Sequence, residues 1–400
     1  MRITASGRAT FALLALSLPG CVHSPEASPL EAVLGETASS GTRLTASIDS
    51  QVAGEDLSEP DVAARHNGQL GAGDVALFDL GSGVAGDEWS IKPANGAVRT
   101  PLIVVLLDQA DNMLARERIG IGGELRHILR DDARALRLGV MPMYNSSGGS
   151  FGLDVAGRYG GPAPAAREQV VWLNFGPGHG VSVNGRSAVA FSSFDAARID
   201  GRYAADSERM KALIVETLRL DYAAYNIQFV TSDQEAPAGD YSVVHFGGEQ
   251  AGLLGLADSV DNYNQHLDQQ AIVFTDEFAP YVSMELSTEE MAAMVANVAS
   301  HELGHLLGLY HTRDPADVMD TTGSARDLTT NQAFSRAALE PSVFAIGYSD
   351  SPALLRQTLG PNPNPPAAPT AKTLRHSSIR GFAQEELCVR CGTCRDFWEN

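Results

Sequence analysis

The stretch SHELGHLLGLYH, residues 300–311, holds three histidines, one glutamate and two glycines. His301 and His305 are four residues apart, so on a helix they project from the same face, one turn apart. A helix packed for stability alone would carry Leu, Ala or Met at such positions. Two imidazoles placed in this way can bind one metal ion, so the spacing predicts a metal site on a helix.

A catalytic zinc site takes three protein ligands and leaves a fourth position open to water. His301 and His305 supply two of these ligands. Gly308 can adopt a positive φ, end the helix and turn the chain, so that His311 returns as the third ligand. The carboxylate of Glu302 can then lie over the open position, accept a proton from the attacking water and pass it to the leaving amine.

These residues match the pattern H-E-x-x-H-x-x-G-x-x-H, which resembles the signature of the metzincin zinc endopeptidases. The resemblance covers about residues 168–345 and implies a catalytic Zn²⁺ and a protein or peptide substrate. Met319, eight residues after His311 in DPADVMD, resembles the methionine turn that lies beneath the metal in this family. Thr312 is nearest the serine of matrixins, and a tyrosine two places after Met319 is absent, so astacin-like and serralysin-like zinc coordination is not expected.

Within this range, residues 253–278 resemble the matrixin loop and edge strand that pair with substrate. Leu254–Ala257 and Ala271–Phe274 are the candidate pairing segments. The loop also carries oxygen ligands of the kind that Ca²⁺ prefers, without a fixed spacing, so a solvated acidic loop is the alternative. The acidic and amide residues concerned are Asp258, Asp261, Asn262, Asp268, Asp276 and Glu277.

Three further histidines are candidates for a structural zinc site like that of matrixins. They are His179, His245 and His266. None has a second ligand at a diagnostic spacing, so we expect ordinary surface or strand histidines.

The N-terminus predicts export. Arg2 and Arg8 precede an apolar run, 11–18, so residues 1–20 are expected to be a signal peptide. The following Leu-Pro-Gly-Cys resembles the bacterial lipobox, which implies that Cys21 carries lipid and anchors the protein to a membrane in the cell envelope. The alternative is a plain secretory signal and a secreted protein.

The expected fold class is α+β. Residues 21–67 are rich in small and polar residues and predict a flexible tether. Residues 68–160 alternate short apolar runs with turn residues, which predicts an all-β sandwich and loosely resembles the bacterial pre-peptidase C-terminal domain. In residues 168–345, strands alternate with long helices, which predicts a mixed twisted sheet. A Pro-rich linker, 346–375, and a Cys-containing tail, 376–400, are expected to follow.

The tail spaces Cys388, Cys391 and Cys394 by two residues each. The alternatives are a small metal site with His376 as fourth ligand, or a disulfide plus a free thiol. Arg390-Cys391-Gly392 also resembles the core of the matrixin latency switch, which lies N-terminal to the catalytic domain in that family. Cys391 is therefore a candidate latency thiol in an unusual place.

The formal net charge is −20, and removal of residues 1–20, with two arginines and no acid, takes it to −22. This charge argues against a nucleic-acid partner. The sequence therefore predicts an exported, lipid-anchored zinc endopeptidase. The alternative is an inactive zinc-containing surface lipoprotein that acts as a binding module, against which the retained Glu302 argues.

Overall fold

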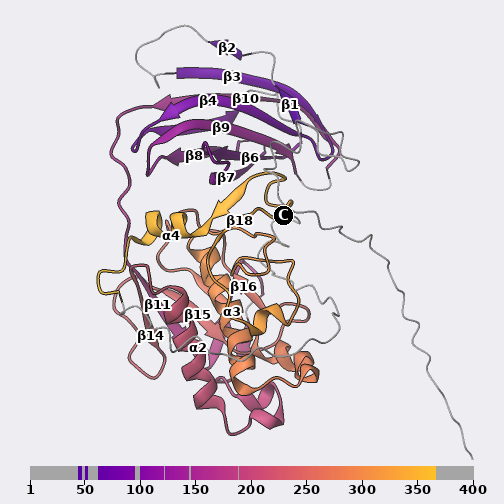
Figure 1. Ribbon diagram of the computed structural model, residues 1–400, viewed down its shortest axis with the longest axis vertical. Helices are drawn as coiled ribbons and strands as arrows, with labels where there is room; N and C mark the ends of the chain where they lie inside the picture. The colour runs from indigo at the N-terminus through magenta and orange to yellow at the C-terminus, as the bar shows by residue number, and fades with distance from the viewer. Residues whose placement is uncertain are drawn as a thin grey trace, which may run out of the picture. The chain divides into compact units, whose positions relative to one another are not determined.

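The computed structural model describes residues 44–46, 50–52, 62–94, 100–120, 122–143, 146–187 and 189–365. The predicted signal peptide, the lipid site at Cys21 and the tail with Cys391 lie outside these residues. Strands fill the described part before residue 160, and strands and helices alternate after it, so the predicted mixed α+β class is confirmed (Figure 1). In the described part, no helix is both long and apolar enough to cross a membrane.

The described residues before 160 form two five-stranded sheets that we call the two-sheet unit. The first has the strand order β1 (Leu44–Ala46), β4 (Val75–Gly83), β9 (Ala133–Pro142), β6 (Leu102–Leu107), β7 (Met113–Ile119). The second has the order β2 (Ser50–Val52), β3 (Val62–Gly71), β10 (Gly148–Arg158), β5 (Glu88–Pro93), β8 (Leu125–Ile128). All neighbouring strands are antiparallel except β1 and β4.

Both sheets contribute to one apolar core, in which Phe78 and Leu138 of the first sheet meet Trp89 and Val155 of the second. Strand β6, with the sequence LIVVLL, is buried along its whole length. Alternate side chains of a strand point to opposite faces. Leu102, Val104 and Leu106 therefore enter the core between the sheets, whereas the other three pack on a second apolar cluster with Phe344 and Ile346.

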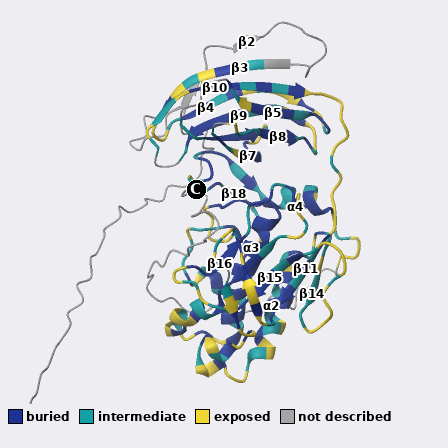
Figure 2. Cartoon of the chain, turned by 180° about the vertical axis from the view of Figure 1, so that it is seen from behind, coloured by how far each residue is buried: buried dark blue, intermediate teal, exposed yellow. Residues whose placement is uncertain are grey.

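A third sheet has the order β14 (Ile227–Thr231), β11 (Gln169–Asn174), β15 (Ser242–Phe246), β17 (Gln270–Val273), β16 (Gly255–Ala257). The first four strands are parallel, and the edge strand β16 runs antiparallel to β17. Helices α2 (Ser207–Asp221) and α3 (Thr288–Leu306) share an apolar core with this sheet. Most of α3 is buried, as its dark blue colour in Figure 2 shows.

Short elements complete the described chain. They are β12 (Gly178–Val181), β13 (Val189–Phe191), η1 (Ala196–Arg198), η2 (Gly201–Tyr203), η3 (Thr275–Met284), η4 (Asp327–Thr329), β18 (Arg336–Ala338), β19 (Tyr348–Asp350) and α4 (Ser351–Leu359).

The linker predicted over 346–375 is wrong for its first part, because this part contains β19 and α4. Strand β19 pairs with β18, and the Asp350 carboxylate caps α4 by accepting a hydrogen bond from Ala353 N at 3.0 Å. Leu355 and Leu359 are buried in the core of the third sheet. These apolar side chains fold the segment, and the run of prolines begins only at Pro361.

Helix α3 begins with a capping box formed by Ser287 and Glu290. Ser287 Oγ accepts a hydrogen bond from Glu290 N at 3.2 Å, and the Glu290 carboxylate accepts one from Ser287 N at 2.9 Å. Two of the first backbone N–H groups, which have no partner within a helix, are thereby satisfied. The capping box fixes where α3 begins, and thus the register of His301 and His305, about four and five turns later.

Ser287→Ala should lower the free energy of unfolding by about 1 kcal/mol, because the N-cap acceptor is lost. Urea unfolding followed by circular dichroism measures this. Ser192→Ala, on an exposed loop, is the control and should leave the midpoint unchanged. Equal midpoints for the Ser287 variant and the parent would show that the box contributes nothing.

Candidate metal centre

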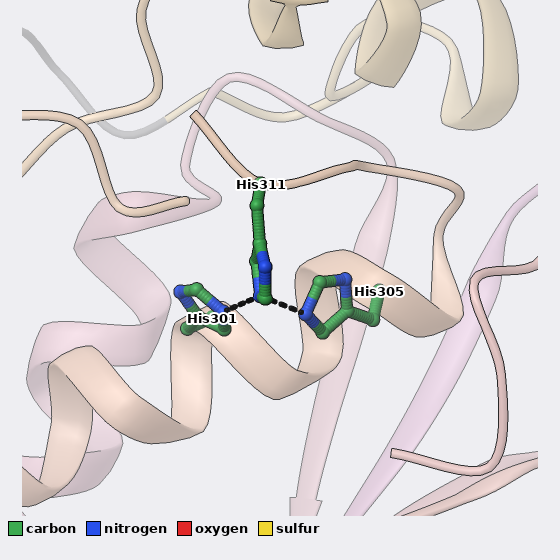
Figure 3. Close-up of side chains that lie close together, drawn as sticks. All are labelled: His301, His305 and His311. Atoms are coloured by element: carbon green, nitrogen blue, oxygen red, sulfur yellow. Dashed lines mark hydrogen bonds between the residues drawn. The ribbon is translucent and has the colours of Figure 1, made fainter. Parts of the chain in front are cut away.

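Helix α3 presents His301 and His305 on one face, as their spacing predicts. Their rings lie at right angles with centroids 4.8 Å apart, and both side chains are buried. His311 comes from the segment after the helix, and its ring lies between the other two (Figure 3). The structure therefore brings the three predicted ligands together.

Gly308 makes this return of the chain possible. Its φ is +95°, a region that side-chain-bearing residues rarely adopt, and a Cβ atom there would lie 2.7 Å from the backbone nitrogen of Tyr263. Leu309 N donates to Gly304 O at 2.9 Å, which closes the helix end. Only glycine fits this turn, and the turn carries His311 back to the helix face.

The three Nε2 atoms converge. His311 Nε2 lies 3.1 Å from the Nε2 atoms of both His301 and His305. Three nitrogens at zinc-bonding distance and tetrahedral angles would lie about 3.4 Å apart. Among the described residues, this is the group of three or more His, Cys, Asp or Glu side chains close enough to share an ion.

Backbone carbonyls fix the orientation of two rings. His301 Nδ1 lies 2.8 Å from Val318 O, and His305 Nδ1 lies 2.8 Å from Leu309 O. A carbonyl oxygen only accepts, so Nδ1 carries the proton and Nε2 keeps its lone pair in each neutral ring. Burial lowers the pKa of His301 to about 4 and lowers the pKa values of His305 and His311 as well. Neutral imidazoles with converging lone pairs are the donor set that zinc takes.

Met319 lies against the same helix. It is fully buried, and a Cβ atom on Gly304 would lie 2.6 Å from its Sδ. The turn that carries Met319 is tied to the segment after His311, because Thr312 N donates to Met319 O at 2.9 Å. Thr312 Oγ1 donates to the Asp317 carboxylate at 2.8 Å, and burial raises the pKa of Asp317 to about 6.

Glu302 is 1 % exposed and lies close to the edge strand β16. A Cβ atom on Gly255 would lie 2.5 Å from Glu302 Oε1, so a larger residue there would displace the carboxylate. A pocket opens at this place. It is lined by Leu254, Gly255, Asn297, Val298, His301, Glu302, Val318, Asp320, Thr321 and Leu328.

Two residues that line the pocket, Asn297 and Val298, are not among the site residues predicted from the sequence. Asn297 and Val298 lie four residues before His301 and Glu302, so they share the helix face with them. Asn297 Nδ2 donates to Leu328 O at 2.7 Å, and its buried Oδ1 has no hydrogen-bond partner in the structure. This spacing was the signal that could have identified the pair.

The family model for matrixins matches residues 205–333, from the start of α2 to beyond the methionine turn. The match contains all three histidines, Glu302 and Met319. The chain contains a matrixin-like domain. The predicted metzincin resemblance is therefore confirmed, and the match and the histidine triad together support a zinc metallopeptidase at the level of the superfamily.

Other comparisons are weak. No curated protein matches the chain. A periplasmic lysozyme inhibitor from Aeromonas hydrophila has 13 % identity and a TM-score of 0.23, and covers 30 % of this chain and 100 % of its own. The pre-peptidase C-terminal domain of a Bacillus anthracis collagenase has 14 % identity and a TM-score of 0.17, and covers 31 % and 100 %. IMPa from Pseudomonas aeruginosa has 13 % identity and a TM-score of 0.19, and covers 68 % and 32 %. These scores are too low to support a structural or functional assignment.

The acidic loop of the matrixin-like domain gives no support for calcium. The Asp258 carboxylate accepts from Gln270 N at 2.7 Å and from Asn184 N at 2.9 Å. Asp276 forms an ion pair with Arg198 at the surface. These carboxylates hold the loop and its neighbours together, and the described residues do not gather them into an oxygen cluster.

The other candidate histidines lie apart from one another. His245 is buried between the side chains of Asn174 and Gln270, with 3.0 Å to each. His266 is exposed and lies 3.4 Å from the Asp261 carboxylate, and His179 is exposed. The described residues thus contain no second histidine site of the structural-zinc kind.

The low pKa of His301 predicts a pH-dependent stability of the metal-free protein. His301 stays neutral in the folded state down to about pH 4, whereas the unfolded chain takes up its proton near 6.5. The contribution of neutral His301 to the free energy of unfolding is therefore complete above pH 6.5. This contribution is lost as the pH falls toward 4, by up to about 1.4 kcal/mol per pH unit. Urea unfolding between pH 7 and 4 should show a shallower decline for His301→Asn than for the parent. If the free energy of unfolding declines with the same slope in both proteins, His301 does not have the lowered pKa.

Proposed function

We propose that this protein is an exported, lipid-anchored zinc endopeptidase that hydrolyses peptide bonds with a metal-activated water. The observation that supports the proposal most strongly is the convergence of three neutral imidazole nitrogens beside a buried glutamate and a pocket. His301, His305 and His311 would hold the zinc ion.

A bound zinc ion supplies a Lewis acid that activates water and polarises the substrate carbonyl. Glu302 is the group that moves the proton. Its carboxylate accepts the proton of the attacking water as the new C–O bond forms, and then donates it to the amide nitrogen as the C–N bond breaks. Burial of Glu302 under Gly255 keeps the carboxylate in one position for both transfers.

The surroundings of Glu302 suit a peptide in extended conformation. β16 is the edge strand of its sheet, and an edge strand can pair with an added strand through backbone hydrogen bonds. The pocket has apolar walls from Leu254, Val298 and Leu328, which would receive one substrate side chain. Substrate pairing along Leu254–Ala257 would place the scissile bond over the histidines.

The cellular setting is proposed from the sequence. The signal-like N-terminus and Cys21 support lipid anchoring in a bacterial cell envelope, with secretion as the outcome if the cysteine is not acylated. The two-sheet unit would then be exported together with the peptidase domain. Cys391 remains a candidate latency thiol, and Cys391→Ala should raise activity if it has this role.

Glu302→Gln should lower kcat/KM for casein peptides by about 10²- to 10⁴-fold, because positioned proton transfer is lost. The zinc content should stay at one ion per chain, since Glu302 is not one of the three ligands. Activity and metal content are measured on the same preparation, by fluorogenic peptide hydrolysis and atomic absorption.

Glu216→Gln, on the exposed side of α2, is the matched control and should cleave at the parent rate. If Glu302→Gln also cleaves at the parent rate, the general-base role is wrong. If the parent binds zinc and cleaves no peptide, the inactive binding lipoprotein is the better account.

A further inference from the structure

Strand β7 is the edge of the first sheet of the two-sheet unit. The loop of the matrixin-like domain that contains Asp261, Asn262 and Tyr263 covers this edge. Leu114 O accepts a hydrogen bond from Tyr263 Oη at 3.0 Å, and Arg116 O accepts one from Asn262 Nδ2 at 3.3 Å. Alternate residues of an edge strand direct their backbone groups away from the sheet. The loop therefore binds the edge at two successive outward positions.

The other side of this loop packs on the end of α3. Asp261 N donates to His305 O at 3.0 Å, so the loop is bonded to the backbone of a proposed ligand. The turn at Gly308 is equally close, because a Cβ atom there would lie 2.7 Å from Tyr263 N and 2.8 Å from Asp261 O. The loop is thus a wedge between the two-sheet unit and the turn that leads to His311.

Tyr263 is the residue that fixes the wedge. It adopts a left-handed φ of 59°, which a non-glycine residue keeps only where its surroundings determine it. The residue is 9 % exposed, and the Arg130 guanidinium carbon lies 4.5 Å from the centroid of its ring, with the His127 ring 5.3 Å away. Both partners belong to the segment formed by β8 and the turn after it.

The segment that carries His311 also contacts the two-sheet unit directly. Tyr310, the preceding residue, is buried in the apolar cluster that contains Ile103 of β6 and Phe344. The Arg116 guanidinium carbon lies 5.4 Å from the centre of the Tyr310 ring, and Arg116 Nε donates to Val343 O at 2.9 Å. Tyr310, within the turn, and Tyr263, packed against Gly308, therefore both contact the two-sheet unit.

We infer that the two-sheet unit is a positioning element of the metal centre, which holds the turn from Gly308 to His311 through Tyr263 and Arg116. The inference rests on the proposed role of the three histidines as zinc ligands. It differs from the view of this unit as a separate accessory module, for which the metal centre would be complete without it.

The physical reason lies in preorganisation. His301 and His305 are fixed by a long buried helix, but His311 follows a glycine turn outside regular secondary structure. A ligand held by packed neighbours loses little conformational freedom when it binds a cation, whereas a loose ligand must be ordered at the expense of affinity. Loss of the contacts around the turn should therefore weaken zinc binding without touching a ligand.

The test compares zinc affinities of the full chain, with zinc alone as the probe, in competition with a chelating dye. Tyr263→Ala should weaken zinc binding by about tenfold or more, as loss of outer contacts to metal ligands commonly does. Val155→Ala is the control, because it opens a cavity in the core between the two sheets, away from the wedge. It should lower the melting temperature and leave the zinc affinity within about twofold of the parent. Zinc affinity unchanged in Tyr263→Ala, or weakened equally in both variants, would overturn the inference.

Tyr263→Phe gives a milder second arm that keeps the ring and removes only the hydrogen bond to Leu114. Native-state hydrogen exchange at the amides of Leu309–His311 should be faster in this variant than in the parent, and unchanged exchange would overturn the inference. This arm needs no zinc, so it tests the positioning role even if the parent binds none. A parent that binds zinc without cleaving peptides would defeat the proposed enzyme, while the affinity comparison would still decide the positioning role.

Discussion

The burial of three imidazole rings around one point is the constraint on which the rest of this structure depends. Rings so close together in an apolar interior must stay neutral, because charged imidazoles would repel one another and lose their hydration. Two carbonyls, Val318 O and Leu309 O, decide which nitrogen of His301 and His305 keeps its lone pair. The long helix, the glycine turn and the methionine turn all place groups around that point.

The helix, its capping box and the metal ligands could be predicted because each depends on local chemistry. Spacing by four sets the faces of His301 and His305, and Ser287 with Glu290 marks the start of the helix. Gly308 could be identified because few other residues adopt a positive φ. These features need only the sequence near them and the rules of helix geometry.

Other features could not be predicted because they depend on residues far apart in the chain. Gly255 must be small only because Glu302, 47 residues later, lies against it. Tyr263 resembles any aromatic residue in a polar loop until β7 and Arg130 are placed beside it. The segment 346–359 was mistaken for a linker because its few apolar residues fold only against a core formed by earlier elements.

The central claim is that the three histidines share one zinc ion and leave one position for water. X-ray absorption at the zinc edge of the purified protein tests it most directly. We predict three nitrogen ligands at about 2.0 to 2.1 Å and one oxygen ligand, all lost in a His311→Ala variant that still folds. A spectrum with sulfur ligands, or one that the His311→Ala variant leaves unchanged, would show that zinc binds elsewhere and would contradict the account.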